Sequence, residues 1–212
     1  MNQALQFIFQ IAILIFSVII HEVSHGAVAY ALGDSTAKDE GRLTLNPVNH
    51  LDPFGSILLP VLTYLMGGFI FGWAKPVPYN PYNLKRPRWL GRISPDALVG
   101  VAGPLSNIFL AVIFGFFIRF SGAYAFFPPA FFQIASFVVF LNLVLAIFNL
   151  APIPPLDGSK VLFAFLPGRA YEIQRFMERY GIILFLAFIF LLSGIIIPIA
   201  DFLFRIITGL GV

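Results

Sequence analysis

The sequence predicts an all-α polytopic membrane protein, with about four transmembrane helices plus a re-entrant hairpin and a short β-hairpin. Hydrophobic residues make up 59% of its 212 residues, and charged residues only 11%. This composition provides more apolar surface than a water-soluble domain of the same length can cover. The apolar residues gather in segments near or above the roughly 20 residues that a helix needs to cross the hydrocarbon core.

The apolar segments alternate with polar stretches that contain turn-forming residues. The apolar segments lie near residues 4–32, 54–72, 97–120, 130–151 and 181–208. In the polar stretch 33–53, the alternation in "GRLTLNP" predicts a short strand or hairpin. The stretch 73–95 is rich in proline and basic residues, which excludes a continuous helix. The stretch 152–180 opens with "PIPPLDGSK" and continues as a short amphipathic segment.

The segment 54–72 is predicted to enter and leave the membrane on the same side. Lys and Arg gather in the stretches 73–95 and 152–180, and such residues accumulate on the cytoplasmic side. Pro60 and a following Gly-Gly pair allow the segment to bend, and irregular backbone is tolerated at membrane depth where protein covers it. The three polar stretches 33–53, 73–95 and 152–180 then all face the cytoplasm. The alternative is five or six simple spans.

Charge and cysteine content limit the possible functions. The net charge of +3 is small and lies in loops, so it indicates membrane orientation and no nucleic-acid partner. The chain has no cysteine, which excludes disulfides and thiolate metal sites. The N-terminus lacks the basic region and cleavage site of a secretory signal, so we expect it in the mature protein. Residues 1–212 are predicted to form one domain.

Three ionisable side chains interrupt the first apolar segment, in "HEVSH" at residues 21–25. His21 and His25 share one helix face and can reach one zinc ion. Glu22 is placed to act as general base toward a water molecule at the metal. The alternative is a chance match or polar helix packing. A charged group inside a membrane costs about 2.5 to 3.5 kcal/mol and is functional by default, which favours the metal site.

A catalytic zinc ion usually takes three protein ligands, so a third is expected. His50 lies in a polar loop and is more typical of a hydrogen-bonding residue, and Asp201 lies at the far end of the last apolar segment. Asp157 follows a run of prolines that breaks the helix, and Gly158 allows a tight turn. A helix cap or a turn residue is the alternative role for Asp157. We predict that Asp157 is the third ligand.

"HEVSH" in a membrane helix, followed by "NLAPIPPLDG" after a later segment, resembles the site-2 protease family of intramembrane zinc metalloproteases. "GDSTAKDEGRLTLNPVNHLDPFGSILLP", "GWAKPVPYNP" and "AGPLSN" are similar to its short bacterial and archaeal branch without a PDZ module, so the resemblance covers most of residues 17–166. It implies one zinc ion per chain, held by His21, His25 and Asp157, with Glu22 as the catalytic base.

The resemblance also implies a substrate and a location. The expected substrate is a transmembrane or membrane-proximal segment of another protein, cleaved in the cytoplasmic half of the cell membrane. Asn107 and Asn149 match family motif positions and are expected to position the substrate or the oxyanion, with interhelical hydrogen bonds as the alternative. Tyr79 departs from the aliphatic residue that is common in relatives. The rival function is a metal-binding or metal-transport membrane protein, which has no need for a base such as Glu22.

Overall fold

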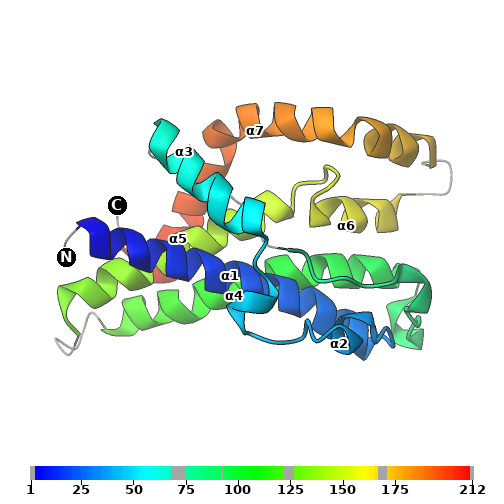
Figure 1. Ribbon diagram of the computed structural model, residues 1–212, viewed down its shortest axis with the longest axis horizontal. Helices are drawn as coiled ribbons and strands as arrows, with labels where there is room; N and C mark the ends of the chain where they lie inside the picture. Colours follow the sequence, from blue (N-terminus) through cyan, green and yellow to red (C-terminus); the bar gives the residue numbers. More distant parts are fainter. Residues whose placement is uncertain (1–2, 68–74, 92, 122–126, 167–170, 211–212) are drawn as a thin grey trace.

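The fold is an elongated bundle of helices (Figure 1). The computed structural model describes residues 3–67, 75–91, 93–121, 127–166 and 171–210. The long helices α1 (Gln3–Ala31), α4 (Pro95–Ser121) and α5 (Pro129–Asn149) form its centre. They are accompanied by α2 (Thr36–Asp39), α3 (Leu59–Gly67), α6 (Asp157–Phe165) and α7 (Tyr171–Thr208).

Three helices are long and apolar enough to cross a membrane: α1 over Leu5–Ala31, α4 and α5. Helix α7 provides a fourth span if its two parts, Glu172–Ile189 and Gly194–Thr208, bent by 67°, are counted as one. The predicted polytopic helical class is therefore correct, and the chain is a membrane protein. Five or six simple spans would need further helices of this length, and the described parts of the chain contain none.

The predicted β-hairpin is wrong, because the described residues contain no strand and "GRLTLNP" forms bends followed by the 3-10 turn η1 (Pro47–Asn49). Side chains take over the hydrogen bonds that a partner strand would make. Thr44 Oγ1 accepts from the Asn46 amide, and Asn46 Oδ1 accepts from the Val48 amide, each at 3.2 Å. His50 Nε2 lies 2.7 Å from the Thr44 carbonyl. Such local bonds compete directly with strand pairing.

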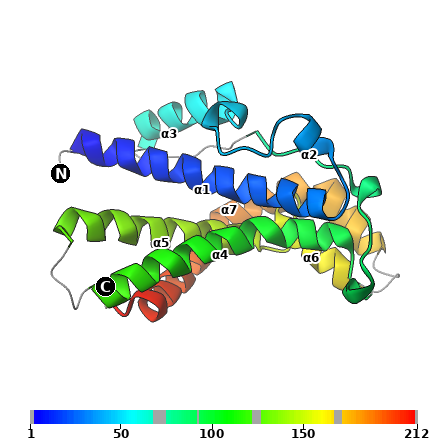
Figure 2. The same ribbon diagram turned by 90° about the horizontal axis from the view of Figure 1, so that it is seen from below.

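The described part of the apolar segment 54–72 forms a π-helical turn, η2 (Pro53–Leu58), and then α3. Helix α3 has nine residues, whereas a span needs about 20. It lies on the outer side of α1, away from α4 and α5 (Figure 2). Leu65 and Met66 are exposed on it, as expected for side chains that face lipid. The second leg of the predicted re-entrant hairpin lies outside the described residues.

Helix α4 is held at the centre of the bundle by close packing against α5 and α7. The buried cluster between these helices consists of Ala111, Ile118, Ala135, Val139, Leu143, Ala200 and Phe204. A Cβ atom at Gly115 would overlap the side chain of Ile207, so the absence of a side chain allows α4 and α7 to approach closely. This packing sets the position of the α4 face that lies against α1.

The loop before α4 is fastened to the end of α1 by Asp34, which is fully buried. Its carboxylate accepts from the Asn80 amide at 2.7 Å and from Asn83 Nδ2 at 2.9 Å. Burial alone raises the pKa of this carboxyl, but the hydrogen bonds from Thr36, Asn83 and Asn80 outweigh it and hold the pKa below its usual range. The loop contains the 3-10 turns η3 (Pro81–Asn83) and η4 (Arg88–Leu90).

Candidate metal centre

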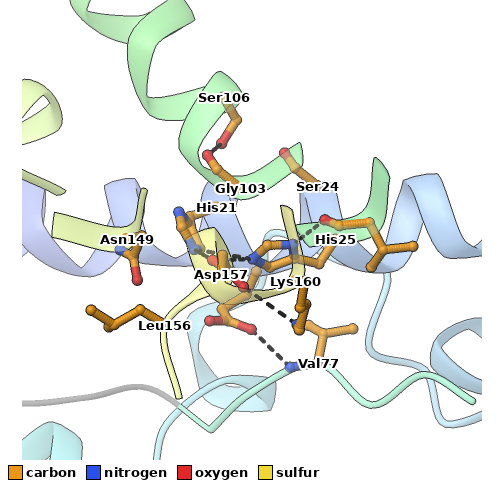
Figure 3. Close-up of polar contacts among 12 residues, drawn as sticks. His21, Ser24, His25, Val77, Gly103, Ser106, Asn149, Leu156, Asp157 and Lys160 are labelled. Atoms are coloured by element: carbon orange, nitrogen blue, oxygen red, sulfur yellow. Dashed lines mark hydrogen bonds and ion pairs between the residues drawn. The ribbon is translucent and has the colours of Figure 1, made fainter. Parts of the chain in front are cut away.

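Three buried side chains converge where α1, α4 and α6 meet (Figure 3). His21 Nε2 and His25 Nε2 lie 3.1 Å apart, and each lies 3.1 Å from Asp157 Oδ2. The exposed fractions of His21, His25 and Asp157 are 6%, 6% and 9%. Among the described residues, this is the one group of three or more His, Cys, Asp or Glu side chains placed to hold a metal ion.

Local structure explains how each ligand candidate reaches this point. His21 and His25 are one turn apart on α1, so their rings project from the same face. Helix α5 ends at Asn149, a proline-containing turn follows, and α6 begins at Asp157. A Cβ atom at Gly158 would lie 2.5 Å from the Ala151 carbonyl oxygen, so glycine is needed to close this turn.

The outer nitrogens of both imidazole rings are hydrogen-bonded. His21 Nδ1 lies 2.6 Å from Asn107 Oδ1, and His25 Nδ1 lies 2.6 Å from the Val99 carbonyl oxygen. Both oxygens are acceptors, so each Nδ1 carries the proton and donates. In the neutral rings both Nε2 atoms then present lone pairs toward Asp157 Oδ2. In that state three acceptor atoms lie 3.1 Å apart, which is the arrangement of a site for a cation.

The site fits a zinc ion in ligand type, spacing and space. Two imidazoles and a carboxylate are a ligand set of catalytic zinc, and ligand atoms of a tetrahedral zinc site lie roughly 3.3 Å apart. The observed separations are 3.1 Å. A Cβ atom at Gly103 on α4 would lie 2.5 Å from His21 Nε2 and at least as close to His25 Nε2. Glycine at this position therefore keeps the space beside the nitrogens open.

Glu22 is oriented by a backbone group that the sequence analysis did not identify. Its Oε2 accepts a hydrogen bond of 2.9 Å from the Val77 amide, in the loop before α4. Val77 is 5% exposed, and Asp34 fastens the same loop through Asn80. A backbone amide has no sequence signature, so no pattern in the chain pointed to this contact.

Comparison with known proteins identifies the family. The profile of Peptidase family M50 matches residues 125–192. A protein of Bacillus subtilis named "Putative zinc metalloprotease YwhC" is 45% identical over 178 residues, which cover 82% of this chain and 76% of that protein. The chain belongs to peptidase family M50, the site-2 protease family of zinc metalloproteases. The predicted family and enzyme class are thereby confirmed.

More distant relatives of this M50 peptidase are named "Putative zinc metalloprotease Rip2". The protein from Mycolicibacterium smegmatis is 35% identical over 159 residues, which cover 74% of this chain and 56% of that protein. The one from Mycobacterium tuberculosis is 30% identical over the same length. No solved structure shows a significant match to the peptidase.

The sequence of the peptidase also contains two asparagines expected to position the substrate, and two residues that were considered as metal ligands and set aside. Asn107 is fully buried and contacts His21. Asn149 lies at the end of α5, on the His21 side of the metal centre, and its Nδ2 donates to the Leu145 carbonyl at 2.9 Å (Figure 3). His50 lies in the loop after α2, and Asp201 pairs with Arg205 at 3.0 Å. Neither belongs to the metal-ligand group.

Lys160 is a further charged residue at the metal centre that the sequence analysis did not single out. Its Nζ lies 3.4 Å from Asp157 Oδ1 and 5.1 Å from the centre of the Tyr79 ring. The Tyr79 hydroxyl donates to Asp96 Oδ1 at 2.6 Å. Lys160 lies three residues after Asp157 at the start of a helix, and this spacing could have indicated that the two side chains are neighbours. Tyr79, the departure from the family pattern, therefore packs against the cation beside a predicted ligand.

Proposed function

We propose that the chain is a zinc-dependent endopeptidase that hydrolyses peptide bonds of transmembrane or membrane-proximal substrate segments. The observation that carries the proposal is the convergence of three acceptors next to Glu22. His21 and His25 come from α1, which is long enough to span a membrane, and Asp157 comes from the start of α6. A zinc ion bound there supplies Lewis acidity toward a peptide carbonyl and activates water. One ion per chain satisfies this ligand group.

The proposed role of Glu22 is proton transfer. Its Oε2 is held by the Val77 amide at 2.9 Å, and we assign the proton transfer to Oε1. The carboxylate takes a proton from the attacking water and delivers it to the leaving amide nitrogen. The Val77 contact restricts the rotation of the carboxylate, which reduces the cost of orienting the base.

The two asparagines are assigned different roles. Asn149 is proposed to position the substrate, because its amide lies beside the metal centre and its bond to the Leu145 carbonyl lies within its own helix. Asn107 already has buried partners for both its oxygen and its nitrogen, so we propose that it orients His21. Its predicted contact with the substrate stays a prediction. A helical substrate hides its carbonyl groups in hydrogen bonds, so local unwinding must precede cleavage.

We propose that the metal centre lies in the cytoplasmic half of the cell membrane. His21 and His25 are in the second half of α1, and the loop before α4 has exposed cations at the same end of the bundle (Figure 1). These exposed cations are Lys75, Lys85, Arg86 and Arg88. Their side of the membrane is cytoplasmic by the positive-inside rule. Residues 1–212 are proposed to act as one catalytic domain.

The experiment compares purified Glu22→Gln and Asp157→Ala variants with the wild type, using a reconstituted transmembrane substrate and elemental analysis of zinc. Glu22→Gln should retain one zinc ion per chain and lower the cleavage rate by about 10² to 10⁴-fold, because only the base is lost. Asp157→Ala should lose zinc and cleavage together. His50→Ala, a matched histidine outside the metal centre, should keep both.

Cleavage at the wild-type rate by Glu22→Gln would contradict the proposed chemistry. Full zinc occupancy in Asp157→Ala would mean that a residue other than Asp157 is the third ligand. Zinc uptake into sealed vesicles, without any cleavage by the wild type, would support the rival function of metal transport.

A further inference from the structure

A series of buried hydrogen bonds leads from His21 across three helices. Asn107 on α4 accepts from His21 Nδ1 at 2.6 Å. Asn107 Nδ2 donates to Asn142 Oδ1 on α5 at 2.8 Å, and Asn142 Nδ2 donates to the Val138 carbonyl at 2.9 Å. Asn107 and Asn142 are both fully buried. Asn142 was not among the candidate residues of the sequence analysis.

The direction of every bond in this series is set at its far end. The Val138 carbonyl only accepts, so Asn142 must turn its Nδ2 toward it and its Oδ1 toward Asn107. Asn107 must then turn Nδ2 toward Asn142, which leaves Oδ1 facing His21. An oxygen at that place requires a proton on His21 Nδ1. A backbone carbonyl on α5 thereby determines which nitrogen of a ring on α1 carries the proton.

Ser17 touches the series at two points. Its hydroxyl lies 3.0 Å from Asn142 Nδ2, and a hydroxyl both donates and accepts, so it sets no direction. Its carbonyl oxygen lies 3.4 Å from Asn107 Nδ2, a long contact that supports the same orientation more weakly than the bond to Asn142.

We propose that Asn142 is a positioning residue that fixes the tautomer of His21 through Asn107. If Asn107 turned over, its Nδ2 would donate to His21 Nδ1, and the ring proton would move to Nε2. That proton would point at Asp157 Oδ2, 3.1 Å away, and the resulting hydrogen bond would occupy the lone pair that a metal needs. The inference rests on the proposed zinc site, but the protonation of His21 is measurable without any cleavage assay.

His25 provides an internal comparison. Its Nδ1 bonds directly to the Val99 carbonyl at 2.6 Å, so its tautomer does not depend on an amide side chain. A change at Asn142 should therefore affect His21 and leave His25 unchanged. General loosening of the bundle would affect both rings.

The test is nitrogen NMR of histidine-labelled, metal-free protein in detergent, compared with zinc affinity from chelator competition. The wild type should show Nδ1 protonated in both His21 and His25. Asn142→Leu should add a signal from unprotonated Nδ1 of His21 alone, and zinc affinity should fall by about 10 to 100-fold. Asn142→Ser, whose hydroxyl sets no direction, should act in the same way and replaces the leucine variant if that one does not fold.

Two further variants separate the direction of the hydrogen bonds from the packing of the helices. Asn142→Asp, as a neutral carboxylic acid, still donates to the Val138 carbonyl and accepts from Asn107, so it should retain both the His21 signal and the zinc affinity. Ser17→Ala removes only the hydroxyl and should also retain both. A fully protonated His21 Nδ1 with unchanged zinc affinity in Asn142→Leu and Asn142→Ser would overturn the proposal. An equal change at His25 would do so as well.

Discussion

Replacing Gly103 by alanine should empty the metal centre without unfolding the bundle. The added Cβ atom would lie 2.5 Å from His21 Nε2, whereas ordinary contacts begin near 3.4 Å. The ring or the helix must therefore move by 0.9 Å, the difference between these distances. Metal sites tolerate errors of about 0.2 Å in ligand distance. A displacement near 1 Å is several times larger than this tolerance and typically lowers activity by about 100-fold.

The assay is zinc content and chelator competition for Gly103→Ala, with thermal unfolding to check the fold. Alanine favours a helix over glycine by about 1 kcal/mol, so helix propensity by itself predicts no loss of stability. Gly194→Ala is the matched control, because a Cβ atom at Gly194 would meet nothing within 4 Å. A Gly103→Ala variant that binds zinc with wild-type affinity would refute the reasoning about space at the site.

The other predictions concern the charge beside Asp157 and the orientation in the membrane. Lys160→Met should strengthen zinc binding by up to about fivefold, because it removes a cation 3.4 Å from Asp157 Oδ1 that repels a metal ion, and a partly exposed charge pair contributes at most about 1 kcal/mol. Lys38→Met should have no effect, although Lys38 also lies over a tyrosine ring, 4.7 Å from its centre. Equal zinc affinity in both variants would contradict a role for Lys160. Single cysteines at Lys38 and Arg88 of this cysteine-free chain should react with a membrane-impermeant reagent from the cytoplasmic side, and one at Phe127, beyond the α4 span, only from the other side. Labelling of Lys38 and Arg88 from opposite sides would contradict the proposed topology.

Short-range patterns in the sequence were enough to predict the helical membrane class and the candidate metal ligands. Long apolar segments predicted helices that cross a membrane, and three such helices are present among the described residues. The spacing of His21 and His25 placed both rings on one helix face, and the prolines before Asp157 predicted the break between α5 and α6. The structure brings these three side chains together, and metal binding by them stays a prediction.

The failed β-hairpin shows where a local pattern misleads. The alternation in "GRLTLNP" is shared by strands and by irregular loops. Thr44 and Asn46 satisfy nearby backbone amides with their side chains, so this segment needs no partner strand. Sequence periodicity does not distinguish the two, because hydrogen bonds from a residue to its near neighbours leave no repeating signal.

The sequence by itself determined the membrane class, the family resemblance and the residues proposed for hydrolysis, because each depends on composition or on short local patterns. Only the tertiary structure decided what surrounds these residues. The Val77 amide at Glu22, the space at Gly103 and the bonds from His21 through Asn107 to Asn142 join segments far apart in the chain. A buried asparagine in a membrane helix bonds to whichever partner the packing presents, and that partner is chosen by how the helices cross.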